Sequence, residues 1–272
     1  MLACVVTAVV WAAVWRLSGG RWVRVETPSM GTAAPVGTLL WVEPVSFASL
    51  RPGDFITFHP PGQPGVTYSH RVYRLDPDGT LRTKGQISAP DPWTLTAHDV
   101  VGKVTMRWWG IGWVVEALPV LLIGAVVLAA AMWWPLRGRW RLPVAVVGTA
   151  LILCLAIVIY QPFTGAQRLS AQPVEGGVRA TYVSTGLLPL RLHSASGQHV
   201  DLRNGQTGAL LSTKATSPGS YPVHIGPHFP FWWWIVLVLA CFVPAVWTVV
   251  FAPKAEPAAR QPSYPRQRTG VH

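Results

Sequence analysis

Ser29, His70 and Asp91 are the residues of this sequence whose types and order could cleave a peptide bond. A serine hydroxyl is a weak nucleophile at neutral pH, and histidine can act as its base because the unperturbed histidine pKa lies near ~6.5. An aspartate behind the histidine selects its tautomer and stabilises the imidazolium. Spacing alone does not show that the three side chains meet, and each could instead be an ordinary turn or strand residue.

Strand and turn signals surround all three residues. Ser29 follows a short apolar segment, and Asp91 comes after a Pro-Asp-Gly turn. Short runs of apolar and β-branched residues are typical of strands, and they cover residues 39–42, 55–58 and 68–73. Residues 16–107 show no sustained helical period, so we predict a small, mostly β domain.

The ordered series of short motifs between residues 20 and 105 resembles the successive boxes of type I signal peptidases. The match is to the branch with histidine as the base, found in the endoplasmic reticulum, archaea and some Gram-positive bacteria. The residues that carry it are Ser29-Met30, the stretches 35–42 and 50–58, Ser69-His70-Arg71-Val72, Thr83-Lys84-Gly85 and Asp91. The resemblance implies a signal-peptidase-like β fold and a Ser-His-Asp mechanism.

The resemblance also implies roles for neighbouring residues. Thr27 stands where the family carries a hydroxyl that helps the Ser29 N–H hold the oxyanion, and Met30 where a hydrophobic residue touches the substrate. Lys84 could be a rival base, but it occupies a position that accompanies the histidine in this branch, which implies a structural or electrostatic role. The implied cleavage site follows small residues in an Ala-x-Ala-like sequence.

The loop before Asp91 departs from the family pattern. Gly85 is followed by Gln86-Ile87-Ser88, where the family usually has an acidic residue, and the connection to Asp91 is one residue shorter. Asp91 alone is then expected to orient His70. This departure leaves open an alternative, a catalytically inactive membrane-anchored relative that acts as a binding or envelope-interaction protein.

The composition indicates a membrane protein. Of the 272 residues, 50% are hydrophobic and only 12% are charged, and the net charge is +11. Positive charge on this background fits cytoplasmic loops and lipid headgroups better than nucleic acid, for which the sequence carries no motif. Cys4, Cys154 and Cys241 lie in apolar runs, so neither a disulfide nor a thiol-zinc site is expected.

No metal and no cofactor are expected. His224 and His228 have helical spacing for a metal pair, yet Gly226 and Pro227 between them argue against a helix.

Long apolar segments divide the chain into parts. We predict an N-terminal membrane anchor at 1–15, the catalytic domain at 16–107, two transmembrane helices at 108–160 joined by a basic hairpin at 135–141, a second extracytoplasmic β-rich domain at 161–230, a transmembrane helix at 231–251 and a disordered basic tail at 252–272. A crossing helix needs ~20 apolar residues, and the run before Arg16 is shorter than this; with that segment counted as an anchor, we predict about four spans. In the second domain we expect strands at 178–183, 187–192 and 221–225. A cleaved signal peptide at the start of the chain would need a positive n-region, which is missing.

Lysine and arginine in short loops predict the orientation. The hairpin arginines and the basic tail belong in the cytoplasm, so both β domains lie outside a multi-pass plasma membrane protein. Arg16, Arg21 and Arg24 oppose this orientation, whereas the resemblance implies it. We therefore predict a membrane-bound serine endopeptidase that removes signal peptides from exported preproteins. The second domain could alternatively bind an envelope component, and the sequence does not predict an oligomeric state.

Overall fold

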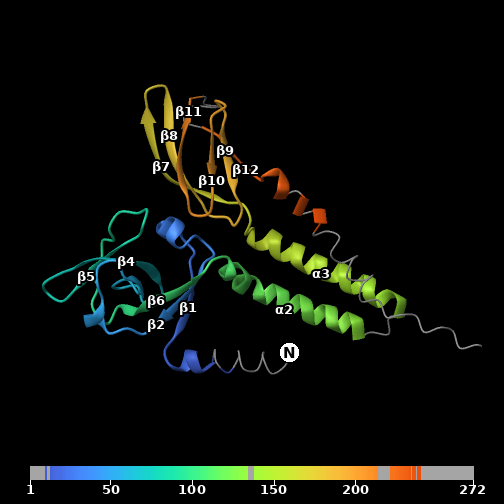
Figure 1. Cartoon of the computed structure of the whole chain (residues 1–272), viewed down its shortest axis with the longest axis horizontal. Helices are drawn as coiled ribbons and strands as arrows, with labels where there is room; N and C mark the ends of the chain where they lie inside the picture. Colours follow the sequence, from blue (N-terminus) through green and yellow to red (C-terminus); the bar gives the residue numbers. More distant parts are fainter. Residues whose placement is uncertain are drawn as a thin grey trace, which may run out of the picture. The chain divides into compact units, whose positions relative to one another are not determined.

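The computed structural model describes residues 10, 13–133, 138–213, 221–233, 235, 236, 238 and 239. It is mostly β, with two β-rich domains and two long apolar helices (Figure 1). Residues 1–229 form one compact unit and residues 230–272 a second one. The tail at 252–272 lies wholly outside the described residues, and the anchor at 1–15 and the span at 231–251 lie largely outside them. Of the hairpin predicted at 135–141, residues 135–137 lie outside them, whereas residues 138–141 are the first residues of a helix and not a loop.

The first domain is built on a six-stranded antiparallel sheet with the strand order β1-β2-β6-β3-β4-β5. The strands are β1 (Arg21–Arg24), β2 (Leu39–Glu43), β3 (Phe55–Phe58), β4 (Tyr68–Leu75), β5 (Leu81–Lys84) and β6 (Val100–Trp108). Two short 3₁₀ helices, η1 (Pro28–Ala33) and η2 (Phe47–Ser49), lie in the connections. The three strands predicted in this region are confirmed as β2, β3 and β4.

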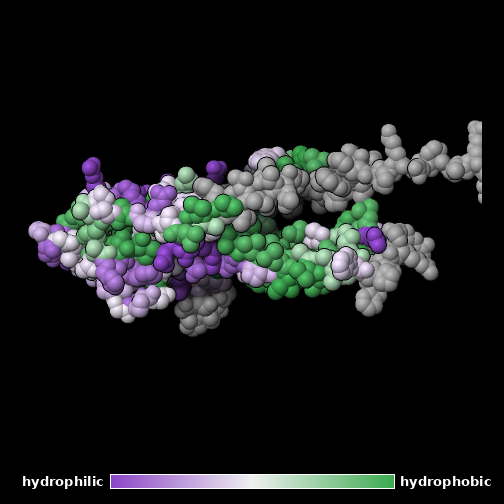
Figure 2. All heavy atoms as spheres, turned by 90° about the horizontal axis from the view of Figure 1, so that it is seen from below, coloured by the Kyte–Doolittle hydropathy of each residue, from purple (hydrophilic) through white to green (hydrophobic). Residues whose placement is uncertain are grey.

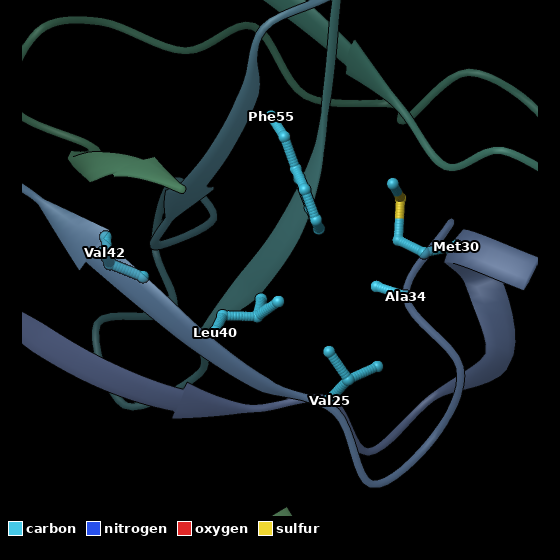
Figure 3. Close-up of a cluster of buried hydrophobic side chains, with 6 residues drawn as sticks. All are labelled: Val25, Met30, Ala34, Leu40, Val42 and Phe55. Carbon is cyan, nitrogen blue, oxygen red and sulfur yellow. The ribbon is translucent and has the colours of Figure 1, made fainter. Parts of the chain in front are cut away.

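Two clusters of buried apolar side chains fill the first domain. Figure 3 shows one cluster, made of Val25, Met30, Ala34, Leu40, Val42 and Phe55, to which the loop containing Ser29 contributes Met30. The other cluster comprises Leu50, Ile56, Phe58, Val72, Leu81 and Leu95. Fully burying a methionine side chain stabilises a fold by about 1.5–3 kcal/mol. Packing of Met30 therefore helps to hold the adjacent Ser29 in place.

Helices α2 (Ile111–Trp133) and α3 (Gly138–Tyr160) are long and apolar enough to cross a membrane, judged by length and composition. They pack closely, because a Cβ added at Gly124 would lie 2.7 Å from Ile152 and one at Gly148 would lie 2.5 Å from Leu128. Most of their large apolar side chains point outward, and Figure 2 shows the described part of this helical pair largely coloured as hydrophobic.

The start of α2 is attached to the first domain. The Gly112 N–H donates to the Gly37 carbonyl at 2.9 Å, and Gly37, with φ +82°, leaves room for the Trp113 indole. Arg24 Nη1 on β1 lies 3.0 Å from Glu116 Oε2. The acidic residue that interrupts this apolar segment thus has a cationic partner in the sheet, as charges near a membrane segment require.

The second domain consists of two three-stranded antiparallel sheets, β10-β9-β12 and β11-β8-β7. Its strands are β7 (Ala166–Val174), β8 (Gly177–Ser184), β9 (Leu190–Ser194), β10 (His199–Leu202), β11 (Thr207–Ser212) and β12 (Val223–Pro227). Leu190 and Leu192 of β9 meet Leu202 and Leu210 in the core between the sheets, so the domain is a small β-sandwich (Figure 1). The predicted strands correspond to β8, β9 and β12, while β7, β10 and β11 were not predicted.

Candidate active site

Ser29, His70 and Asp91 form one continuous chain of hydrogen bonds. Ser29 Oγ lies 2.8 Å from His70 Nε2, and His70 Nδ1 lies 2.7 Å from Asp91 Oδ2. An ionised carboxylate can only accept, so the imidazole proton of neutral His70 is on Nδ1 and Nε2 is free to accept from the Ser29 hydroxyl. This is the protonation pattern that a serine nucleophile and its base require.

Strand pairing places His70 within reach of both partners. His70 is the third residue of β4, is only 3% exposed, and pairs with Ile56 of β3. The rings of Phe58 and Tyr68 lie beside the imidazole, with centroids 6.3 and 5.7 Å away. The base therefore sits against apolar walls on a rigid element, where its orientation is fixed by packing.

Asp91 is held by β5. The Thr83 hydroxyl donates to Asp91 Oδ2 at 2.6 Å, and the Asp91 N–H donates to the Thr83 carbonyl at 2.9 Å. The short connection after Gly85 thus brings Asp91 to His70 without the acidic residue that the family pattern usually has. The sequence assigned no role to Thr83. Alternation along β5 could have suggested one, since Thr83 lies opposite Val72 and shares the face of β4 that carries His70.

Lys84 lies on the other face of the sheet. It pairs with Arg71, the neighbour of His70, and successive residues of a strand point to opposite faces. The geometry consequently gives the base position to His70. Asp99 is also engaged elsewhere, because its carboxylate accepts from the N–H and the hydroxyl of Thr96, both at 2.7 Å.

Thr27 and Ser29 lie side by side at the start of η1. Their hydroxyl oxygens are 3.3 Å apart. The Ser29 carbonyl accepts from the Ile87 N–H at 3.0 Å, which fixes the peptide that follows the nucleophile. The resemblance assigns the Thr27 hydroxyl and the Ser29 N–H to an oxyanion hole, and the Thr27 hydroxyl lies next to Ser29 Oγ as that role requires.

Gly85 allows β5 to approach the nucleophile closely. A Cβ at this position would lie 2.8 Å from the Ser29 carbonyl oxygen and 3.1 Å from Ser29 Cβ. It would also lie 2.4 Å from Ser88 Oγ, a buried hydroxyl without a hydrogen-bond partner among the described residues. A side chain at position 85 would therefore displace the loop that carries Ser29.

A cleft of about 520 Å³ opens beside Ser29. It is lined by residues 22–27, 29, 30 and 65–69. Strand β1 lies at the edge of the sheet, and the start of β4 pairs only with β3 among the described strands, so both walls carry backbone groups that can pair with an extended peptide. Met30 is 1% exposed, so it belongs mainly to the core and touches the cleft wall with little surface.

Comparisons with family models, with curated proteins and with solved structures found no match. Within the described part of the chain, no group of three or more histidine, cysteine, aspartate or glutamate residues is arranged to hold a metal ion. His224 lies on β12, and His228 directly follows that strand and contacts Asp201 and Arg191. The chemistry of the site therefore has to be argued from Ser29, His70 and their neighbours.

Proposed function

We propose that the protein is a membrane-bound serine endopeptidase that removes N-terminal signal peptides from exported preproteins. The single observation that carries the proposal is the hydrogen-bonded series Ser29–His70–Asp91, with both distances under 3 Å. Three residues far apart in sequence meet in the order and with the tautomer that acyl transfer to serine needs. The resemblance to type I signal peptidases supplies the substrate class.

In the proposed reaction Ser29 Oγ attacks the scissile carbonyl carbon while His70 Nε2 takes the hydroxyl proton. The tetrahedral oxyanion is stabilised by the Ser29 N–H and the Thr27 hydroxyl, and loss of one such donor typically costs ~10²–10³ in rate. His70 then gives the proton to the departing amine, leaving an acyl-serine and the free mature N-terminus. A water deprotonated by the same Nε2 hydrolyses the ester, and Asp91 keeps the proton on Nδ1 throughout.

The cleft beside Ser29 suits an extended substrate. A segment of the preprotein laid between β1 and residues 65–69 would add a strand to these edges, and main-chain hydrogen bonds would orient the scissile bond. Deep side-chain pockets are unnecessary, because a substrate anchored in the same bilayer meets the site at high effective concentration. Selection of small residues in an Ala-x-Ala-like sequence comes from the resemblance.

The proposed location is the outer face of the plasma membrane. Helices α2 and α3 supply two of about four proposed spans, together with segments near residues 1–15 and 231–251. The positive residues of the hairpin at 135–141 and of the tail place those segments in the cytoplasm and both β domains outside.

The test is cleavage of a preprotein by the full-length protein purified in detergent, with the new N-terminus identified by mass spectrometry. We expect one cut after a small residue, and no cut by Ser29→Ala or His70→Ala, because the pair acts as a unit. An acylating inhibitor should label Ser29 of the wild type. A protein that binds the preprotein but neither cuts it nor is acylated would instead be an inactive relative.

A further inference from the structure

The second domain touches the nucleophile loop through the turn between β10 and β11. Gly205 in this turn has φ +69°, and a Cβ added there would lie 2.3 Å from the Gly31 carbonyl oxygen and 2.9 Å from the Thr32 nitrogen. The two backbones are therefore in direct contact, only two residues after Ser29. Both domains belong to the same compact unit, residues 1–229.

The turn that makes this contact is firmly held within its own domain. The Gln206 N–H donates to the Arg203 carbonyl at 2.8 Å, and the Gln206 side chain accepts from the Arg203 N–H at 2.9 Å. The Gly205 N–H donates to the Ser184 carbonyl at 3.1 Å. With its amide nitrogen facing the Gly186 and Leu187 carbonyls, Asn204 donates to both at 3.0 Å. The contacting surface is thus a rigid element.

The nucleophile loop is also held by the connection between β5 and Asp91. The Ile87 N–H binds the Ser29 carbonyl, and Ile87 Cγ2 lies 2.8 Å from where a Gly31 Cβ would be. Gly31 adopts φ +50° and ψ −132°, a conformation that favours glycine. The backbone after Ser29 is therefore in contact with both Ile87 of the first domain and Gly205 of the second.

We propose that Gly205 is a positioning residue, through which the second domain holds the Ser29 loop in register with His70. This inference rests on the proposed peptidase function. The second domain then belongs to the catalytic unit. The direction of the backbone at 30–32 determines the orientation of the Ser29 hydroxyl and of the Ser29 N–H that would donate to the oxyanion. A misplacement of about 1 Å at a reacting group can cost ~10²-fold in rate.

The test compares Gly205→Ala with Gly197→Ala in the full-length protein. Gly197 has φ +85° in the turn between β9 and β10 and nothing within 4 Å of its missing Cβ, so alanine there adds backbone strain without a new contact. We expect Gly205→Ala to lower kcat at least tenfold with KM changed less than twofold, and to slow acylation of Ser29 equally. Gly197→Ala should keep kcat within twofold of the wild type, although the thermal stability of both variants falls.

Asn204→Ala provides a second variant, in case Gly205→Ala does not fold. It removes the two amide donors that orient the turn and adds no bulk. A fall in kcat of about threefold or more, at unchanged KM, would support the inference. Equal kcat for wild type, Asn204→Ala and any folded Gly205→Ala would overturn it while leaving the peptidase function intact. A wild-type protein that neither cuts nor is acylated would overturn the proposed function, and this inference with it.

Discussion

Thr83 and Asp91 are joined twice, by a 2.6 Å hydrogen bond from the Thr83 hydroxyl to Asp91 Oδ2 and by a 2.9 Å bond from the Asp91 N–H to the Thr83 carbonyl. The same oxygen, Oδ2, accepts the hydrogen bond from His70 Nδ1. One strand residue thereby fixes both the backbone and the carboxylate of the residue behind the base.

We predict that Thr83→Val lowers kcat about tenfold with little change in KM. Valine keeps the volume and removes the hydroxyl, so Asp91 loses a donor worth about 1.5–3 kcal/mol to a charged acceptor, part of which orients His70. Steady-state cleavage of a preprotein measures the effect. Thr57→Val is the matched control: Thr57 is equally buried, its hydroxyl contacts Ser69 at 2.9 Å, and it lies on the sheet face opposite His70. A kcat of Thr83→Val equal to that of Thr57→Val would contradict the prediction.

We predict that Asp91→Asn is nearly as damaging as His70→Ala. Loss of the carboxylate favours the wrong imidazole tautomer, a change that can cost ~10⁴ in turnover while the geometry survives. Raising the pH should restore little activity, because the defect lies in the tautomer. Asp99→Asn is the control, since the Asp99 carboxylate accepts from the N–H and the hydroxyl of Thr96 within its own turn. If Asp91→Asn retained more than about a tenth of wild-type activity, this would contradict the orienting role of Asp91.

Spacing alone did not show that Ser29, His70 and Asp91 meet; the resemblance predicted it, and the structure brings the three side chains within hydrogen-bond distance. Local strand signals predicted β4, which carries His70, but not η1, which carries Ser29. Ser29, His70 and Asp91 lie in short motifs that follow one another in the same order as in the family that the sequence resembles. Strands β2 and β3 could be predicted because they are buried apolar runs bounded by turn residues. The position of β6 between β2 and β3 could not be predicted, because it depends on pairing with strands more than 40 residues away in sequence.

The second domain was harder to predict for a related reason. Strand β7 is exposed along most of its nine residues, so its sequence lacks the apolar alternation that marks a half-buried strand. Strand β10 has only four residues. The contact between Gly205 and Gly31 could not be predicted from the local sequence, since a glycine between two strands normally indicates only a turn.

We predict that Glu116→Gln slows cleavage of a membrane-anchored preprotein more than cleavage of a short soluble peptide. Glu116 at the start of α2 pairs with Arg24 of β1, and Arg24 lies in the wall of the cleft. The pair therefore helps to fix the position of the cleft relative to the start of α2. The ratio of the two kcat/KM values in proteoliposomes measures this effect.

Glu26→Gln is the matched control, because Glu26 binds the same Arg24 at 2.8 Å but is 68% exposed, compared with 26% for Glu116. Glu26 also lines the cleft that both substrates would enter, so any effect of its loss on binding should be the same for both. Exposed ion pairs contribute about 0–1 kcal/mol, so this variant should leave the ratio unchanged. An equal ratio in both variants would argue against a role for the α2 attachment.

We predict that Asp54→Asn destabilises the protein near pH 7 and makes no difference at strongly acidic pH. Burial raises the pKa of Asp54, but hydrogen bonds from Lys103 and the Arg51 N–H outweigh burial and keep the pKa below the usual 3.8. Stability from a depressed pKa is complete above the unfolded value and disappears as the pH falls through the folded value. The thermal stabilities of the two proteins should therefore converge as the pH falls from neutral to well below 3.8. Glu175→Gln is the control, since Glu175 is an exposed carboxylate in the turn between β7 and β8 and has no hydrogen bond or ion pair among the described residues.

The last prediction concerns the orientation of the chain in the membrane. After Cys4, Cys154 and Cys241 are replaced by alanine, a cysteine at Gly197 should react with an impermeant thiol reagent in intact cells, whereas one at Gly138 should react only after permeabilisation. Gly138 begins α3 beside the arginines of the hairpin, which the positive-inside rule keeps in the cytoplasm. Gly197 lies in a turn of the second domain with open space around it, so the reagent meets no steric barrier there.

Activity of each cysteine variant provides the control for correct insertion. Labelling of both positions in intact cells would contradict the proposed crossing of the membrane by α2 and α3, and labelling of position 138 alone would put the Ser29 site on the wrong side for exported substrates. Such a result would contradict the proposed function even if the purified protein cut a preprotein in detergent, because a signal peptide is removed only where its cleavage site emerges from the bilayer.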